Sequence, residues 1–206
     1  MVAIVDYGVG NLFSLKSSLA AVGAEVVVSS DIEVLKKADQ VILPGVGAFE
    51  DAARKLRESG LAEKLICLAK SGKPFLGICL GMQMLFEKSF EYGEHEGLGL
   101  INGNVKAIDG VIPEGYKIPH IGWNALIMKG ERNPLFKYIN DGDHVYFVHS
   151  YYAADCDGSV IATSEYGAEL TAAVADGNIF GCQFHPEKSG KVGLAILKAF
   201  TEMKGE

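Results

Sequence analysis

The chain has 206 residues, a length typical of one domain with a sizeable hydrophobic core. Hydrophobic residues make up 49% of it and charged residues 22%, which excludes disorder as the dominant state. The formal net charge of −7 argues against a broad nucleic-acid surface, and no apolar run is long enough to predict a membrane span.

The four cysteines are scattered along the chain, and no Cys-x-x-Cys pair occurs. This spacing argues against a disulfide framework and against a zinc site. The first residues contain neither a basic segment nor a long apolar core, so no signal peptide is expected. We therefore expect a cytoplasmic protein with reduced thiols, and we predict neither a metal site nor a cofactor.

Strand-like and helix-like segments alternate in the first half. Short β-branched runs predict strands over residues 1–7, 24–30, 39–45 and 73–79. Apolar residues at helical spacing predict helices over residues 12–22, 31–38, 49–70 and 80–88. Asp31 can cap the second helix, and Gly60 is expected to interrupt the third. This alternation with short loops predicts a mostly parallel open sheet with helices on both faces.

The second half is rich in turns from residue 97 to residue 181. Its strand-like runs cover residues 104–108, 144–153, 159–166, 170–175 and 179–184, with a turn expected at 176–178. An amphipathic helix is expected over residues 190–204. Since no linker, repeat or low-complexity segment is visible, we predict a single α/β domain over residues 1–206, with a strand-rich second half.

The most distinctive local feature is a cysteine flanked by glycines, in Gly77-Ile78-Cys79-Leu80-Gly81. It lies between an expected strand and an expected helix, where small residues two before and two after relieve crowding at a strained turn. Such a turn exposes the side chain at the carboxyl edge of the sheet, where ligands bind in open α/β folds. The helix N-terminus favours a thiolate, and the backbone N–H of Leu80 is a candidate oxyanion donor. An ordinary buried thiol is the alternative, and that interpretation is kept for Cys67, Cys156 and Cys182.

A thiol nucleophile needs a base, and the base needs a group that orients it. His185 precedes Pro186 and Glu187, and the restricted proline backbone could place His185 and Glu187 on one side. Glu187 would then accept the ring N–H and fix the tautomer that takes the thiol proton. A strand end with a capping carboxylate is the alternative. The other histidines receive no role: His95 and His144 are expected in exposed or turn-like segments, and His120 and His149 flank strand-like runs.

A third candidate is the segment Pro44-Gly45-Val46-Gly47, which follows an expected strand. Its glycine-flanked peptides can approach a ligand closely, so Gly45, Val46 and Gly47 are candidates for the second oxyanion donor. The segment is not a Walker loop, because no Gly-Lys-Ser/Thr follows. Residues 8–11 likewise lack the full dinucleotide-binding fingerprint.

Two of these motifs, residues 77–83 and residues 183–187, together resemble the signature pair of class I glutamine amidotransferases, which use a Cys-His-Glu triad. Four further blocks resemble, more specifically, the glutaminase subunits of imidazole glycerol phosphate synthases. They are DYGVGNL at 6–12, PGVGAF at 44–49, HIGWN at 120–124 and YFVHSYY at 146–152. The resemblance covers nearly the whole chain.

The resemblance implies that Cys79, His185 and Glu187 hydrolyse glutamine to glutamate and ammonia through a glutamyl thioester. It implies that the oxyanion is held by the Leu80 N–H and by a peptide of residues 45–47. The other matching positions are substrate contacts: Gln83 lies beside the glutamine pocket in the family, and Gly47, Ser150 and Tyr151 hold the charged ends of the substrate.

The resemblance also implies a partner, because the chain shows no synthase module of its own. This partner is a (β/α)8-barrel cyclase that receives the ammonia through an internal tunnel. It makes imidazole glycerol phosphate and aminoimidazole carboxamide ribotide in histidine biosynthesis. Trp123 and Asn124 match a loop facing this partner, and Asn11 and Lys188 match positions near the subunit boundary. A core aromatic residue is the alternative for Trp123, and a plain surface lysine is the alternative for Lys188.

Three other functions are compatible with parts of the pattern. The chain could serve as the amidotransferase subunit of another pathway, with the same triad. It could be a cysteine hydrolase or chaperone-like protein of the same architecture, although such proteins usually lack the distant His-Pro-Glu. An inactive regulatory subunit is the third alternative, and the intact triad argues against it.

Overall fold

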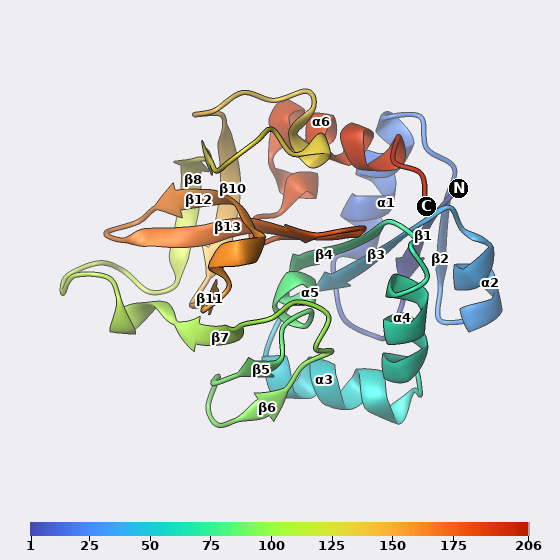
Figure 1. Cartoon of the computed structure of the whole chain (residues 1–206), viewed down its shortest axis with the longest axis horizontal. Coiled ribbons are helices and arrows are strands. Elements are labelled where there is room, and N and C mark those ends of the chain that lie inside the picture. Colours follow the sequence, from blue (N-terminus) through green and yellow to red (C-terminus); the bar gives the residue numbers. More distant parts are fainter. Residues whose placement is uncertain (206) are drawn as a thin grey trace.

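The computed structural model describes residues 1–205, and its centre is an eight-stranded mixed sheet seen nearly edge-on in Figure 1. The strand order is β2 (Val26–Ser29), β1 (Val2–Val5), β3 (Gln40–Gly45), β4 (Phe75–Cys79), β14 (Ile179–Cys182), β13 (Glu169–Asp176), β12 (Val160–Glu165) and β9 (Ile127–Met128). The strands from β2 to β14 are parallel to one another, and β13, β12 and β9 continue the sheet antiparallel. The prediction of a mostly parallel sheet is therefore confirmed.

Helices cover both faces of this sheet (Figure 1). On one face lie α1 (Leu12–Ala21) and α6 (Gly190–Thr201), and on the other α2 (Ile32–Lys37), α3 (Phe49–Glu58) and α4 (Ala62–Ala69). Both faces of β3 are covered, which explains the apolar run that follows Gln40. Val41 and Leu43 join the core under α3 and α4, and Ile42 joins the core under α1 and α6. No helix among residues 1–205 is long and apolar enough to cross a membrane.

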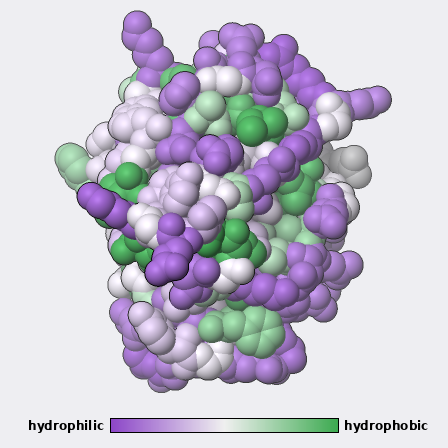
Figure 2. All heavy atoms as spheres, turned by 90° about the vertical axis from the view of Figure 1, so that its left-hand side faces the viewer, coloured by the Kyte–Doolittle hydropathy of each residue, from purple (hydrophilic) through white to green (hydrophobic). Residues whose placement is uncertain are grey.

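The strand-rich second half builds two smaller sheets beside the large one. One contains β11 (Tyr151–Ala154), β7 (Asn104–Ala107), β5 (Lys88–Ser89) and β6 (His95–Glu96), and the other pairs β10 (His144–His149) with β8 (His120–Ala125). Short 3-10 helices cover Ile108–Gly110, Pro134–Phe136, Asp157–Ser159 and, as η4, Pro186–Lys188. Figure 2 shows the end of the molecule next to these sheets, where apolar side chains form several separated patches among polar ones.

Several local expectations are confirmed. The Asp31 side chain accepts a hydrogen bond from Glu33 N at 2.9 Å and so caps α2. The helix expected over 49–70 is divided into α3 and α4, with Gly60 in the left-handed region at φ +67°. Residues 176–178 connect β13 to β14 in an antiparallel hairpin.

The helix expected over residues 80–88 is wrong beyond its first turn, because α5 covers only Leu80–Gln83. The carbonyls that would continue it are taken by a later segment: Met84 O accepts from Leu98 N at 2.8 Å, and Leu85 O accepts from Leu100 N at 2.8 Å. The competing contacts come from distant residues, so helical spacing does not reveal them.

The second half also departs from expectation in three places. The run at 144–153 is divided at Ser150, with β10 in one sheet and β11 in another. His144 begins β10 instead of lying in a turn, and the strand His120–Ala125 was not among those expected. The C-terminal helix ends at Thr201, earlier than residue 204.

Candidate active site

Cys79 lies at the strained turn that its flanking glycines predict. It is the last residue of β4, and α5 begins at the next residue. Its backbone has φ +55° and ψ −113°, a conformation that costs energy for any residue with a side chain. A Cβ atom on Gly81 would lie 1.9 Å from the Leu43 carbonyl oxygen, and one on Gly77 would lie 2.6 Å from the Gly81 carbonyl oxygen. Only glycine therefore allows the close approach that fixes the cysteine.

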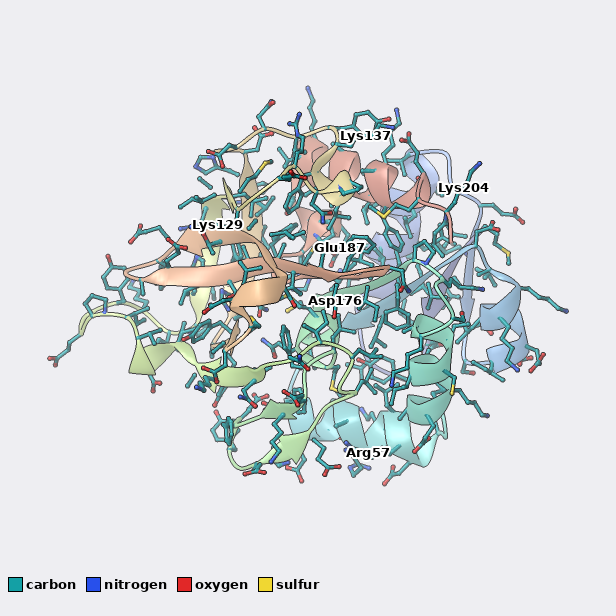
Figure 3. The ribbon with its side chains drawn as sticks, in the orientation of Figure 1. Arg57, Lys129, Lys137, Asp176, Glu187 and Lys204 are labelled. Carbon is teal, nitrogen blue, oxygen red and sulfur yellow. The ribbon has the colours of Figure 1, made fainter. Side chains whose placement is uncertain are left out.

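The buried pair beside this thiol is His185 with Glu187. His185 Nδ1 lies 2.8 Å from Glu187 Oε1, and both side chains are only 3% exposed. Figure 3 shows Glu187 near the middle of the view, whereas Lys137 and Lys204 lie near its edge. Because the carboxylate accepts the Nδ1 proton, Nε2 is left to face the sulfur. Burial alone would lower the pKa of His185, but hydrogen bonds with Cys79 and Glu187 raise it to about 9.

The backbone of His185 is fixed by neighbouring elements. His185 N donates to Tyr146 O on β10 at 3.0 Å. The Ser189 hydroxyl donates to His185 O at 2.6 Å and accepts from Tyr146 N at 2.9 Å. The imidazole is therefore anchored to β10 and η4, elements that are distant in sequence from the cysteine.

A cavity of about 320 Å³ opens onto the sulfur and the imidazole. This is within the usual size range of small-molecule sites. The residues that line it come from six separate segments: Val46, Gly47, Cys79, Leu80, Gln83, Glu91, Tyr92, Pro119, Val148, His149, Ser150, Tyr151 and His185. The candidate nucleophile, the candidate base and the candidate substrate contacts of the sequence analysis therefore line one cavity.

The candidate oxyanion donors divide into two groups. Leu80, Val46 and Gly47 line the cavity, and Gly47 is in the left-handed region at φ +94°. Gly45 lies behind the turn instead, where an added Cβ atom would be 2.7 Å from Gly81 N. The structure thus assigns Gly45 to close packing against the nucleophile turn, and the peptides after it face the cavity.

A chain of buried amides joins the cavity wall to the sulfur. Gln83 Nε2 donates to Tyr151 O at 3.1 Å and to Gln183 Oε1 at 3.0 Å. Gln183 Nε2 in turn donates to Cys79 Sγ at 3.8 Å. The sequence analysis assigned no role to Gln183, although it begins the motif that contains His185 and Glu187.

Glu91 is a second residue that the sequence analysis missed. It is the only carboxylate among the described residues that line the cavity, and its Oε2 accepts from Phe49 N at 2.7 Å. The neighbouring Tyr92 has φ +53° and packs edge-to-face on Tyr151, with ring centroids 6.2 Å apart. Nothing in the local sequence around Glu91 distinguishes it from other surface glutamates, because the fold alone brings it to the cavity.

The residues expected at a partner boundary have different environments. Trp123 is 52% exposed and packs edge-to-face on Tyr146, so it is no core aromatic. Lys188 is exposed, with its Nζ 5.9 Å from the centroid of the Tyr146 ring. Asn11 caps α1 by accepting from Ser14 N at 3.4 Å. The fourth expected residue, Asn124, has its amide between His120 and the carbonyl of Glu165.

The remaining cysteines lack the setting of Cys79. Cys156 and Cys182 are buried, and burial raises the pKa of both thiols, to about 11 for Cys156. Cys67 is exposed on α4. Among residues 1–205, no three His, Cys, Asp or Glu side chains are grouped in a way that could hold a metal ion.

Comparison with known proteins identifies the family. A family model described as "Glutamine amidotransferase class-I" matches residues 3–203, and the chain belongs to this family. It is 52% identical over 204 residues to the imidazole glycerol phosphate synthase subunit HisH of Caldanaerobacter subterraneus subsp. tengcongensis, covering 98% of each chain. It is 50% identical to the subunit of the same name from Geobacillus sp., covering 98% of this chain and 97% of the relative.

Solved structures agree on the fold. The structure of PurLQS from Thermotoga maritima has a TM-score of 0.73 at 23% identity, covering 97% of this chain and 96% of that one. At this level of identity the likeness concerns the arrangement of strands and helices only. The mixed sheet with helices on both faces is thus a fold that glutamine amidotransferases share.

Proposed function

We propose that this chain is the glutaminase subunit of an imidazole glycerol phosphate synthase. The observation that carries the proposal is the cavity of about 320 Å³ in which Cys79, held at a strained turn, faces the buried His185–Glu187 pair. Membership of the amidotransferase family and identities near 50% to HisH subunits over almost the whole chain support the substrate and the pathway.

The triad would act by nucleophilic catalysis. The Cys79 thiolate, paired with protonated His185, attacks the side-chain carboxamide carbon of glutamine. When the tetrahedral intermediate collapses, the C–N bond breaks and His185 gives its proton to the departing ammonia. His185 then takes a proton from water, whose oxygen attacks the thioester carbon, and glutamate leaves as the C–S bond breaks. Glu187 keeps Nδ1 protonated throughout, so that Nε2 serves both steps.

Two sets of groups would bind the substrate around this sulfur. The N–H of Leu80 and a peptide of residues 45–47 would hold the oxyanion. Backbone groups of Gly47, Ser150 and Tyr151 would bind the charged end of glutamine. We add Glu91 to this set, because a carboxylate at the cavity wall complements the substrate ammonium group.

The ammonia would pass to a separate subunit. We propose the (β/α)8-barrel cyclase as this partner, which would join the ammonia to its phosphoribulosyl-formimino carboxamide ribonucleotide substrate. Trp123 on β8 and Lys188 on η4 are exposed and both lie against Tyr146 of β10. Together with Asn11 and Asn124 they would lie at the boundary. Exposed aromatic residues of this kind are enriched in protein interfaces.

The proposal is tested by measuring glutamate release from glutamine with the chain alone, and then with the cyclase and its nucleotide ligand. Turnover that is strong only in the complete mixture, together with formation of imidazole glycerol phosphate, is the expected result. Cys79→Ala should abolish glutamine-dependent synthesis and preserve synthesis from added ammonium salts, because the cyclase uses ammonia directly. Loss of both activities in a folded complex would contradict the division of labour, and no turnover in the unmodified complex would favour another pathway.

A further inference from the structure

Beside the cavity, the buried His149 and His120 and the half-buried Asn124 form a continuous chain of contacts between two backbone carbonyls. Starting from Tyr151 O, His149 Nδ1 lies at 2.8 Å and His149 Nε2 lies 3.0 Å from His120 Nδ1. His120 Nε2 is 2.9 Å from Asn124 Oδ1, and Asn124 Nδ2 donates to Glu165 O at 2.9 Å. We call His149, His120 and Asn124 the histidine network.

The histidine network is one proton short when both rings are neutral. Four contacts separate the two carbonyls, and each contact needs one hydrogen between its two heavy atoms. Each neutral imidazole supplies one N–H, and the amide supplies a hydrogen to only one of its two contacts, whichever way it is turned. The total is three hydrogens for four contacts. The network is therefore complete only when one ring carries a second proton, and otherwise one contact joins two acceptors.

The geometry favours His120 as the site of this proton. Its ring is stacked between Tyr166, with centroids 4.0 Å apart, and Phe147, with centroids 5.1 Å apart. Aromatic faces stabilise a cation placed over them. The titratable groups facing His120 are His149 on β10 and Tyr166 after β12, and His185 faces the network from beyond His149. Burial, together with the charges of His120 and His185, lowers the pKa of His149 to about 4, despite its hydrogen bond to Tyr151 O.

The network ends at the part of the cavity wall where the chain leaves one sheet for another. β10 ends at His149 and β11 begins at Tyr151, so the His149 ring spans this break to reach Tyr151 O. The same carbonyl accepts from Gln83 on the other side. His149, Ser150 and Tyr151 all line the cavity, so the network is joined to this corner of its wall.

We propose that His120 and Asn124 are positioning residues of the glutaminase site, and that a proton shared with His149 completes the contacts which hold the Ser150–Tyr151 corner. This inference rests on the proposed function and names a regulation of the same site. Neither residue touches the cavity; both act through His149. Burial lowers the pKa of His120, so at neutral pH the network is mostly incomplete and the corner is held less firmly. Acidification completes it.

The proton count is tested directly by NMR of the ring nitrogens in histidine-labelled chain, between about pH 4 and pH 8. We expect neutral His120 to carry its hydrogen on Nδ1 and to gain a second one on Nε2 as the pH falls. His149 should keep its hydrogen on Nδ1. A neutral His120 that holds its hydrogen on Nε2 over the whole range would overturn the proposal.

The functional consequence is tested by the KM for glutamine in the complex with cyclase and nucleotide ligand, between about pH 5 and pH 7. In this range His185 stays protonated, because its pKa is about 9. We expect the KM to fall as the pH falls, by about tenfold, the factor that corresponds to one net hydrogen bond. His120→Phe keeps the aromatic stack and removes the ring that takes the second proton, so its KM should no longer depend on pH.

A second variant keeps the proposal testable if His120→Phe does not fold. Asn124→Leu removes the two contacts of the amide and leaves those of His149 with Tyr151 O and with His120. The two neutral rings supply the two hydrogens that these contacts need. No extra proton is required, so the pH dependence of the KM should again disappear. His144→Gln is the matched control, because His144 is an exposed histidine on β10, the strand that carries His149. This variant should retain the wild-type dependence of the KM on pH. A wild-type pH profile in both network variants would overturn the inference and leave the proposed function intact. If the unmodified complex does not turn over glutamine, the proposed function fails, and the NMR titration still tests the proton count.

Discussion

The two halves of the sequence hold the candidate catalytic groups by different means. In the first half, Cys79 is fixed by backbone contacts, with Gly81 pressed against the Leu43 carbonyl so closely that no side chain fits. In the second half, His185 is fixed by hydrogen bonds to Glu187, Tyr146 and the Ser189 hydroxyl. The turn around Cys79 should therefore tolerate almost no added side-chain volume. The surroundings of His185 should tolerate substitutions that conserve the shape of the replaced side chain.

Among the variants that test this comparison, Gly81→Ala should have the largest effect. An added methyl group would overlap the Leu43 carbonyl, so β3 and the turn cannot both keep their positions. We expect the free energy of unfolding to fall by about 3 kcal/mol or more, measured by urea denaturation, with loss of activity. Gly110→Ala is the control, because nothing lies within 4 Å of its added Cβ atom. Equal stability of the two variants would refute the steric account.

A smaller effect is expected from Glu187→Gln, which conserves shape and removes the charge beside His185. The wild-type pKa is raised from 6.5 to about 9, so the stabilisation from this imidazolium is complete below pH 6.5 and is lost as the pH rises through 9. In the variant the pKa of His185 should fall, and the loss of stability between pH 6.5 and pH 9 should shrink. Urea denaturation at both ends of this range measures the change.

The control for this variant is Glu202→Gln, which removes a surface carboxylate paired with Lys137. Its pH dependence of stability across the same range should match that of the wild type. We also expect Glu187→Gln to lower kcat/KM by about 10- to 100-fold, because the amide still occupies the position that orients the ring. A fall as large as that of Cys79→Ala would show that the charge itself is indispensable.

The smallest effect is expected from Gln183→Leu. This variant removes the amide that donates to Cys79 Sγ at 3.8 Å. This contact joins a side chain from the second half of the sequence to the nucleophile in the first half. Because the sulfur loses a hydrogen-bond donor, its alkylation at a fixed pH should slow by about twofold to tenfold. The rate of reaction with iodoacetamide measures the change. Gln40→Leu, which alters another buried glutamine far from the sulfur, should leave the alkylation rate unchanged.

The same division explains what could be predicted from the sequence. The turn at Cys79 and the pair His185–Glu187 depend on residues two positions apart, so spacing alone indicated both. Glu91 is held at the cavity by a contact with a residue 42 positions away, and Gln183 contacts the sulfur of a residue 104 positions away, and spacing gives no signal for either. The early end of α5 has the same cause, since residues 97–101 take the carbonyls that would have continued the helix.

The break at Ser150 means that one part of the cavity wall and the nucleophile belong to different sheets. Strand β10 also reaches the catalytic groups, because Tyr146 O accepts from His185 N at 3.0 Å and Val148 O lies 4.0 Å from Cys79 Sγ. A small shift of β8 and β10 would therefore move this part of the wall and the base together, while the turn around Cys79 stays in place. We expect sequence changes on these two strands to alter the affinity for glutamine and the reactivity of the thiol together, so that this one small sheet adjusts both properties.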